Sequence, residues 1–401
     1  MTGRTTSKLG DVARFVRGIT FKPDDLVPLL SDGAVACMRT KNVQSEIDLN
    51  DVWGVPKNFV KRSEQFLNEG DILVSTANSW NLVGKCCWVP ELQWPATLGG
   101  FISALRADTR KIDPRFLYHW LATDITQARV RSCARQTTNI ANLSIPQCLE
   151  IEISLPLLEE QQRISAILDQ ADELRGKRQR ALDRLSQLGN AIFIEMFGDP
   201  VQNPFDLPVR RLGDVGSLDR GVSKHRPRND PALLGGVHPL IQTGDVANAD
   251  GYIRHFSSTY SDLGLRQSRK WPVGTLCITI AANIGKTAIL GIEACFPDSV
   301  VGFSPGSSTN AEYVQHWMGR IQKRLEEIAP QSAQKNINLA ILRALPIPVP
   351  PVDDQKKFAL RIQALEAQKE SLRRARDEAD LLFASLQNHA LGGEQQQCAV
   401  T

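Results

Sequence analysis

Two stretches of the chain carry apolar side chains at the seven-residue spacing of long, paired helices. One set runs from Ile164 to Ile192, broken only by Arg178, and the other runs from Phe358 to Leu386. A second set is interleaved three residues behind each of these. It is apolar from Ile167 to Leu188 but only half apolar from Arg361 to Leu382. This spacing predicts two helices that pair through one strong and one weaker seam.

Both predicted helices have clear start and stop signals. They begin after a proline-rich corner with Glu159-Glu160-Gln161 and Asp353-Asp354-Gln355, acidic groups that suit the positive end of a helix dipole. Gly198 and Gly392 mark their ends. About 36 residues make a rod of roughly 50–55 Å. Because this exceeds what a compact domain needs, we expect a protruding antiparallel pair rather than two core helices inside one globule.

The segments before each helix are mixed in pattern and rich in short strands. Asp71–Ser75 and Gly274–Thr279 have the composition of buried strands, and short helices are expected at Pro114–Asp124 and Ala311–Ile328. The predicted fold class is therefore α+β, with two mixed α/β domains separated by two long antiparallel coiled-coil helices. The predicted division is a first head (1–150), a central helix (151–199), a second head (200–345) and a distal helix with a C-terminal tail (346–401).

The chain is also an internal repeat, which predicts pseudo-twofold symmetry. The helical parts align without a gap, whereas the heads keep only short matching segments. The matches are Leu9-Gly10-Asp11-Val12 with Leu212-Gly213-Asp214-Val215, Arg17-Gly18-Ile19-Thr20 with Arg220-Gly221-Val222-Ser223, and Asn142–Gly198 with Asn336–Gly392. A unit used twice, with heads that have drifted on a constant frame, indicates two recognition modules.

Composition narrows the function without naming it. A net charge of +3 over 401 residues is too small to indicate a nucleic-acid binder, so any basic surface has to be local. Met1–Asp11 has no apolar core, and the longest apolar stretch, around Leu276–Ile284, is far short of a membrane span. We therefore expect a cytoplasmic protein with no membrane association. The eight cysteines include no C-x-x-C and have no histidine at ligand spacing, which predicts reduced thiols and no metal site.

Three segments resemble catalytic motifs, and each motif is incomplete. Gly285-Lys286-Thr287 lacks the earlier glycine of a phosphate-binding loop, because position 280 is Ile280. Asn203-Pro204-Phe205 lacks the second proline of an amino-methyltransferase motif, and Pro297-Asp298 with Asp354-Gln355-Lys356 is only a distant nuclease pattern. The sequence predicts no catalytic residue and no cofactor. A stand-alone DNA adenine methyltransferase and a coiled-coil adaptor that binds only protein remain as alternatives.

Polar loops offer a better case for binding. Amide and guanidinium groups match base edges and lysines suit phosphates, although such residues are also common in ordinary solvated loops. Their recurrence in both halves favours DNA binding. The candidate DNA-binding residues are Asn78, Trp80, Asn81, Lys85, Arg135, Gln136, Asn139, Arg220, Lys224, Arg226, Asn283, Lys286, Gln334, Lys335 and Asn336.

Taken in order, these segments resemble one known family, the DNA-specificity subunits of type I restriction-modification systems. The resemblance covers nearly the whole chain. It rests on the two L-G-D-V starts with their following R-G pairs, Gly84-Lys85 and Gly285-Lys286, Asn139-Ile140 and Asn336-Ile337, Leu155 to Gln161 with Val349 to Gln355, and Glu195-Met196-Phe197-Gly198-Asp199-Pro200.

The resemblance implies a non-catalytic specificity subunit of a type I restriction enzyme. Each target recognition domain would read one half of a bipartite, asymmetric double-stranded DNA target, and the helices would act as a spacer. Two modification (methyltransferase) subunits would pack on the helices, and restriction/translocase subunits could join them. Methyl donor, ATP and magnesium would be used by those partner chains.

Overall fold

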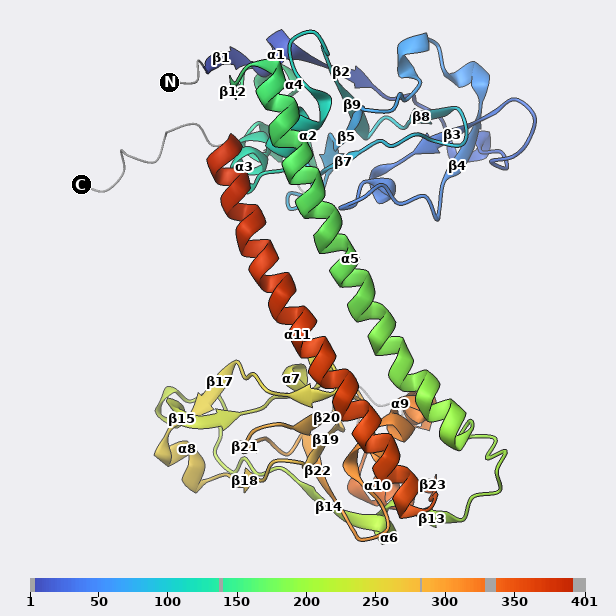
Figure 1. The fold of residues 1–401 in the computed structure, drawn as a ribbon, viewed down its shortest axis with the longest axis vertical. Coiled ribbons are helices and arrows are strands. Elements are labelled where there is room, and N and C mark those ends of the chain that lie inside the picture. The colour runs from blue at the N-terminus through green and yellow to red at the C-terminus, as the bar shows by residue number, and fades with distance from the viewer. Residues whose placement is uncertain (1–3, 137–139, 282, 329–336, 392–401) are drawn as a thin grey trace. The chain divides into compact units, whose positions relative to one another are not determined.

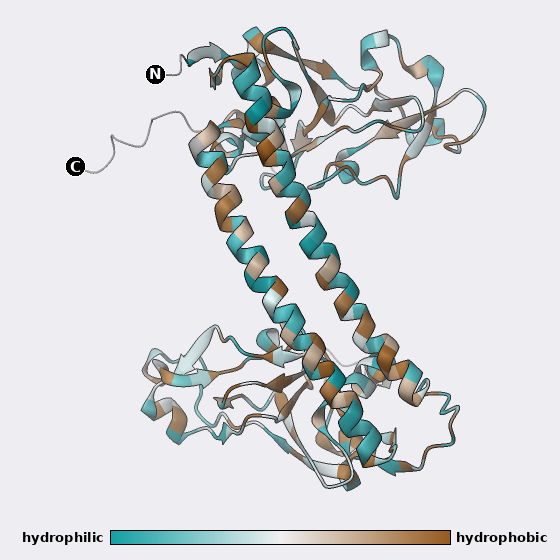
Figure 2. Ribbon diagram, in the orientation of Figure 1, coloured by the Kyte–Doolittle hydropathy of each residue, from teal (hydrophilic) through white to brown (hydrophobic). Residues whose placement is uncertain are grey.

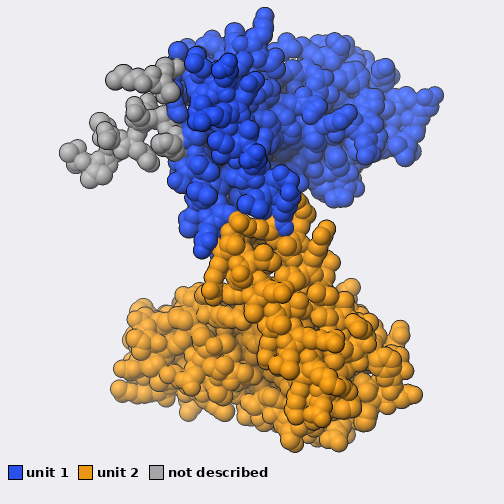
Figure 3. All heavy atoms as spheres, viewed as in Figure 1, with its two compact units in different colours: residues 1–177, 377–401 blue, residues 178–376 orange. Residues whose placement is uncertain are grey.

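Two helices of 40 residues each, α5 (Leu158–Phe197) and α11 (Val352–Leu391), are the longest elements of the structure (Figure 1). The computed structural model describes residues 4–136, 140–281, 283–328 and 337–391. It divides into two compact units, residues 1–177 with 377–401 and residues 178–376 (Figure 3). Each long helix contributes one part to each unit. The predicted helices are confirmed, together with both starts and the end of α5, whereas Gly392, the predicted stop of the second helix, lies outside the described residues.

Within each unit the two long helices run antiparallel. In unit 1, the Arg175 guanidinium donates from Nε to the Asp380 carboxylate at 2.5 Å. In unit 2, Arg178 donates to the carbonyl oxygen of Ala375 at 2.9 Å, and further along the rings of Phe193 and Phe358 lie 5.7 Å apart. Partner numbers in α11 fall as numbers in α5 rise, so the predicted antiparallel arrangement is confirmed.

The predicted seam was right for one set of positions and wrong for the interleaved set. Ile164 and Phe358 are buried, whereas Ile167, Leu174 and Leu188 are more than two-fifths exposed. The buried partners lie four residues, not three, after the first set. They include Leu168, Leu182, Gly189, Ile362, Lys369 and Phe383. Because Gly189 is small and Lys369 is charged, hydrophobicity alone did not reveal this set. The hydropathy colouring of α5 and α11 accordingly alternates along both helices (Figure 2).

Unit 1 contains two sheets and two smaller strand pairings. Its main sheet has the order β2-β9-β5-β7 and is antiparallel throughout, and the second sheet has the order β4-β3-β8. A small sheet of order β10-β11-β6 and the pair β1-β12 complete it. The strands are β1 (Thr5–Lys8), β2 (Ala13–Arg17), β3 (Ala34–Met38), β4 (Trp53–Pro56), β5 (Ile72–Ser75), β6 (Ala77–Asn78), β7 (Cys86–Trp88), β8 (Ala96–Leu98), β9 (Ile102–Ala107), β10 (Ala134–Gln136), β11 (Ala141–Leu143) and β12 (Glu152–Leu155).

The short helices of unit 1 are α1 (Leu9–Val12), α2 (Pro114–Leu121), α3 (Asp124–Ser132) and α4 (Ile145–Leu149), with 3-10 helices at Pro23–Asp25, Thr40–Asn42, Lys57–Phe59 and Ser63–Gln65. The prediction of a single helix at Pro114–Asp124 was wrong, because two helices occupy this region. The first helix ends before Ala122, and the Thr123 hydroxyl caps the second by accepting a hydrogen bond from the Thr126 amide at 3.3 Å.

Unit 2 repeats the main sheet of unit 1 and adds a strand. Its order is β14-β22-β19-β20-β16, beside a second sheet of order β17-β15-β21-β18 and the pair β13-β23. The strands are β13 (Val209–Arg211), β14 (Gly216–Arg220), β15 (Leu234–Leu240), β16 (Tyr252–Ile253), β17 (Ser258–Tyr260), β18 (Lys270–Trp271), β19 (Leu276–Thr279), β20 (Thr287–Leu290), β21 (Ala294–Cys295), β22 (Val300–Pro305) and β23 (Pro346–Pro348). The helices are α6 (Leu212–Val215), α7 (Thr243–Asn248), α8 (Asp262–Arg266), α9 (Ala311–Ile328) and α10 (Leu339–Ala344), with a 3-10 helix at Pro231–Leu233. The helix predicted for Ala311–Ile328 is confirmed.

A buried glutamine fixes each long helix to its head. Gln161 accepts the Asp113 amide at 2.9 Å and donates to the carbonyl oxygen of Pro156 at 2.9 Å. Its equivalent Gln355 accepts from Thr309 and from the Asn310 amide, and donates to two carbonyl oxygens. Because Asp113 and Asn310 in turn cap α2 and α9, the helix starts and the heads are held as one hydrogen-bonded corner.

Apolar packing joins each head to the ends of both long helices. In unit 1, Ile164 and Phe383 belong to the core that contains Phe116 and Trp120. In unit 2, Phe193 and Phe358 lie in the same core as Trp317. The described cysteines form no disulfide, and five of these seven are buried. No helix in the described ranges is both long and apolar enough to cross a bilayer.

Candidate nucleic-acid interface

A loop ending in Gly-Lys leaves the main sheet of each unit in the same way. In unit 1 the Ser75 amide donates to the carbonyl oxygen of Lys85 at 2.9 Å, and the Gly84 amide donates back to Ser75 at 2.8 Å. In unit 2 Thr279 bonds to Lys286 at 2.9 Å, and Gly285 bonds back to Thr279 at 2.9 Å. We call residues 76–85 the first Gly-Lys loop and residues 280–286 the second.

The glycine of each loop is required by backbone conformation and by packing. Gly84 has φ +85° and Gly285 has φ +75°, in the region that favours glycine. A Cβ atom would also lie 2.9 Å from Val130 at position 84 and 3.2 Å from Leu325 at position 285. The glycines therefore seat the loops on α3 and α9, whereas the residues between strand and glycine can vary.

The two loops differ in length, which changes one predicted correspondence. The amide of Lys85 donates to the carbonyl oxygen of Leu82 at 3.2 Å, and that of Lys286 donates to Asn283 at 3.3 Å. Asn283 therefore occupies the backbone position of Leu82, and Asn78 to Asn81 form an extension of the first loop. Each loop also accepts one amide from downstream, Leu143 at Thr76 (2.8 Å) and Ile337 at Ile280 (3.0 Å).

In unit 1 the small sheet brings two predicted groups of residues together. Strand β11 lies between β6 and β10, so that Ala141 pairs with Asn78 on one side and with Gln136 on the other. Arg135 and Gln136 are exposed at this sheet. Asn78, which belongs to the first Gly-Lys loop, donates to the Ser75 hydroxyl at 3.1 Å. Asn78 and Gln136 lie in one cross-strand row and so on one face of this sheet, whereas Arg135, opposite Asn142, lies on the other face.

Other residues of the first Gly-Lys loop are also accessible. Trp80 is 40% exposed and Asn81 is exposed. The Lys85 ammonium donates to the amide oxygen of Gln44 at 2.6 Å, so this cation is held at the surface by a neutral group. An exposed aromatic ring and a cation without a carboxylate partner suit stacking and phosphate contact.

Of the three basic candidate residues between positions 220 and 226, one is already engaged within unit 2. Arg226 donates to the carbonyl oxygens of Ser223 and His225, and lies 3.4 Å from Asp298. Arg228 pairs with the same carboxylate. Within the described ranges, Arg220 and Lys224 are exposed and make no side-chain hydrogen bond or ion pair. These two side chains are therefore open to a ligand, whereas Arg226 is engaged within the head.

Four predicted residues, Asn139, Gln334, Lys335 and Asn336, lie outside the described residues. Sequence reasoning also missed two exposed residues that the repeat could have indicated. Asn142, opposite Arg135 in the small sheet, is the counterpart of Asn336. Arg17 is the counterpart of Arg220 and ends β2 as Arg220 ends β14.

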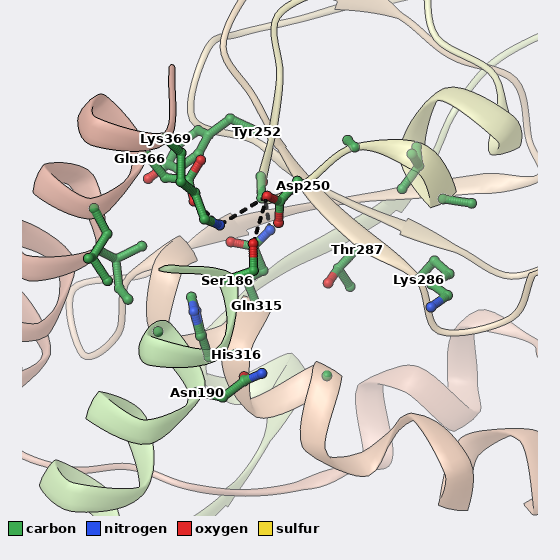
Figure 4. A pocket seen from close by; sticks show the side chains of 18 of the residues that line it. Ser186, Asn190, Asp250, Tyr252, Lys286, Thr287, Gln315, His316, Glu366 and Lys369 are labelled. Atoms are coloured by element: carbon green, nitrogen blue, oxygen red, sulfur yellow. Dashed lines mark hydrogen bonds and ion pairs between the residues drawn. The ribbon is translucent and has the colours of Figure 1, made fainter. Parts of the chain in front are cut away.

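Unit 2 also contains a polar cavity of about 330 Å³ between α5, α9, α11 and the second Gly-Lys loop (Figure 4). Beside it, the Lys369 ammonium lies 2.8 Å from Glu366 and 3.0 Å from Asp250. Burial lowers the pKa of His316, which also lines the cavity. Across the described part of the chain, no three His, Cys, Asp or Glu side chains are grouped to hold a metal ion.

The strongest carboxylate shift in unit 1 is structural rather than catalytic. Burial alone would raise the pKa of Asp169, yet hydrogen bonds from His119 and Arg115 lower it to about 2. His119 lies 2.7 Å from this carboxylate and is 2% exposed. The group links α2 to α5, which suits a role in holding the head.

Comparisons with known proteins agree with this geometry. A family model of the type I restriction modification DNA specificity domain matches residues 1–184 and 204–379. The StySPI specificity subunit of Salmonella potsdam is 26% identical over 397 residues, covering 92% of this chain and 83% of the relative. The EcoKI specificity subunit of Escherichia coli is 21% identical over 399 residues, with the same coverage of each chain.

Two solved structures have the same fold. The S subunit of a type I restriction-modification system from M. genitalium aligns over 97% of this chain and 96% of that chain, with a TM-score of 0.63 and 15% identity. A chain from a structural study of type I system assembly and conformational transition aligns over 97% of both chains, with a TM-score of 0.54 and 17% identity.

Proposed function

Because the chain belongs to the type I restriction modification DNA specificity family, we propose that it supplies sequence specificity to a DNA-modifying complex and performs no chemistry itself. Each head, residues 1–150 and 200–345, reads one part of a split, asymmetric target in double-stranded DNA. The observation that carries this proposal is the pair of Gly-Lys loops. Their backbone hydrogen bonds are the same in both units, whereas their lengths and side chains differ.

A constant frame with variable loops is the arrangement that two independent readers need. Direct readout depends on placing amide and guanidinium groups at base edges to within a fraction of a groove. The shared backbone bonds fix where each loop starts and ends. The loop residues, Asn78 to Asn81 in one head and Asn283 in the other, are then free to specify different bases.

The modification subunits dock on the long helices in this proposal, and two of them are expected from the two-fold repeat. Several apolar side chains on these helices are exposed, whereas other apolar side chains on the same helices are buried. They are Ile167, Leu174, Leu188, Leu360, Leu381 and Leu382. Apolar groups left exposed at regular places on a helix support docking of a partner. A restriction/translocase subunit would join the same complex.

Mapping methylated adenines in DNA modified by the assembled complex tests the proposal directly. We expect a motif with two specified parts separated by an unspecified gap. Trp80→Ala with Asn81→Ala should relax the preference in one part only, and Asn283→Ala in the other part only. A contiguous motif, or loss of preference in both parts from a change in one loop, would contradict the assignment of one head to each part.

The spacer role has its own test. Deleting seven residues from each helix removes about 10 Å, or roughly three base pairs, so the unspecified gap should shorten by about that number. Contacts on one face of DNA recur about every 34–36 Å, which makes the complex sensitive to such a change. An unchanged gap in an assembled, active complex would refute the spacer.

Partner docking is tested by Leu381→Gln with Leu382→Gln. Both side chains are more than three-fifths exposed, so the double variant should fold normally but bind modification subunits more weakly. Leu30→Gln with Val237→Gln, which changes two exposed apolar residues of the heads, is the matched control. Equal binding by the two double variants would argue against docking at this place.

A further inference from the structure

The same arginine-glycine turn ends the first strand of the main sheet in each unit. Strand β2 ends at Arg17, and β14 ends at Arg220. A Cβ atom on Gly18 would lie 2.2 Å from the carbonyl oxygen of Gly99, and one on Gly221 would lie 2.2 Å from that of Phe296. No other residue fits without a backbone shift, so both turns are held firmly in place.

The strand register puts each arginine beside the Gly-Lys loop of its own head. In unit 1, Arg17 pairs with Ser103, which pairs with Val74, one residue from the end of β5. In unit 2 the corresponding row is Arg220, Val301 and Ile278. Two strand spacings separate each arginine from its loop strand by about 10 Å. That is less than the roughly 12 Å width of the DNA major groove, so an arginine here can reach the backbone that borders a groove entered by the loop.

The two guanidinium groups are also available. Both side chains are exposed, and neither makes an ion pair or side-chain hydrogen bond within the described ranges. Neighbouring arginines are engaged, since Arg14 lies 3.9 Å from Glu64 and Arg228 pairs with Asp298. A free guanidinium presents a planar fork of donors that matches the two oxygens of a phosphate.

We propose that Arg17 and Arg220 are matched anchors for the DNA phosphate backbone, one in each head, a role that rests on the proposed function. They set the position of each head on the duplex and do not read bases. Because both heads have the same arginine and the same turn, these features cannot account for a difference in base preference between the heads. The specificity therefore comes from the Gly-Lys loops and the anchoring from the turns.

The test measures affinity as a function of salt for the complex with its modification subunits. Two duplexes are used, one with the mapped target and one with that target scrambled. The variants are Arg17→Ala, Arg220→Ala and both together, with Arg17→Lys and Arg220→Lys as conservative replacements. Arg110→Ala and Arg211→Ala are the controls. Both are exposed arginines near the opposite end of a main sheet; Arg211 tests loss of an exposed charge there, and Arg110, which lies 3.0 Å from Asp108, tests loss of a paired one.

Each alanine variant should bind both duplexes roughly eightfold more weakly at 0.1 M salt, and the logarithmic salt slope should fall by about 0.9 for each arginine lost. The double variant should show both losses, the lysine variants should keep the slope, and the controls should match the unmodified complex. The ratio between target and scrambled DNA should not change.

Alanine variants with the slope of the unmodified complex, or a changed preference for particular bases, would overturn the anchor assignment. If the unmodified complex failed to distinguish target from scrambled DNA, the proposed function would fail instead. The salt slopes on either duplex would still decide the role of the two arginines.

Discussion

The two junctions between long helices and heads use equivalent residues but fill the space beside a histidine differently. In unit 1, the rings of His119 and Phe383 lie 6.5 Å apart, and both side chains are buried. In unit 2, the position equivalent to Phe383 is Gly189, where a Cβ atom would lie 3.3 Å from Nε2 of His316. Gly189 and His316 both line the polar cavity of unit 2.

The charges around each junction are also equivalent in kind but different in origin. Arg175 lies 2.9 Å from Asp172 on its own helix and is paired with Asp380 from α11. Lys369, its equivalent, has Glu366 on its own helix but takes its second carboxylate from Asp250 of the head. Ser186 stands where Asp380 would be and donates to Asp250 at 3.2 Å. The frame therefore keeps one cation between two carboxylates, while the element that supplies the second carboxylate can change.

The largest expected effect on stability comes from removing the Phe383 ring, which has no counterpart in unit 2. Phe383→Ala should lower the free energy of unfolding of unit 1 by about 4 kcal/mol, because it opens a cavity beside His119 and Arg175. Urea unfolding followed by hydrogen exchange in unit 1 would measure it. Leu382→Ala, at a side chain 62% exposed, is the matched control and should change the value by less than about 0.5 kcal/mol. Equal effects of the two variants would show that Phe383 does not support the junction.

The buried glutamines give the next largest effect and should differ between units. Gln355→Leu leaves four groups without their hydrogen-bond partner and should lower the free energy of unfolding by about 3 kcal/mol. Gln161→Leu leaves two such groups and should lower it by about 2 kcal/mol. Denaturant unfolding of the two variants checks the order. The reverse order would mean that the hydrogen bonds do not set the strength of the corners.

Acid should weaken unit 1 through Asp169. The pKa of this carboxyl is held at about 2, below its ordinary value of 3.8, so it stabilises the fold above about pH 4. That contribution should be lost as the pH falls from about 4 to 2. Because the side chain is about one-third exposed, solvent screening limits the effect to about 1 kcal/mol.

Asp169→Asn should remove this pH dependence, as measured by unfolding at successive pH values. The equivalent position in unit 2 is Gln363, which cannot titrate. Burial would raise the pKa of Asp250 in unit 2, but Lys369 and Arg373 lower it. Because Asp250 is present in both the unmodified protein and the Asp169→Asn variant, its contribution cancels when the two are compared. A variant with the pH dependence of the unmodified protein would contradict the assignment.

The smallest effects concern the helix glycines beside the cavity. Gly319→Ala should stabilise unit 2 by about 0.5–1 kcal/mol, because alanine is the better helix former and no atom lies within 4 Å of the added Cβ. Gly189→Ala should stabilise it less, since the new methyl group would meet His316 and Ile362 at 3.3 and 3.5 Å. Thermal unfolding of both variants tests this. A larger gain at Gly189 would show that the cavity readily accepts a side chain there.

Much of the fold could be predicted from local pattern. The starts of α5 and α11, the end of α5, helix α9, and strands β5 and β19 all follow from nearby residues, because capping, periodicity and glycine stops act within a few positions of the chain. The repeat likewise indicated which residues are equivalent. It could have identified Arg17 from Arg220 and Asn142 from Asn336.

The amino-acid order by itself determined the two long helices, the two heads and their kinship, since these depend on short-range chemistry and on a duplicated sequence. Only tertiary structure decided that the seam uses positions four residues apart and that Asn283 has the backbone position of Leu82. It also decided that Asp298 forms ion pairs with Arg226 and Arg228. It also decided that Gly189 borders a cavity where Phe383 fills its counterpart. Each of these depends on which distant side chain arrives opposite, and no local pattern along the chain specifies that partner.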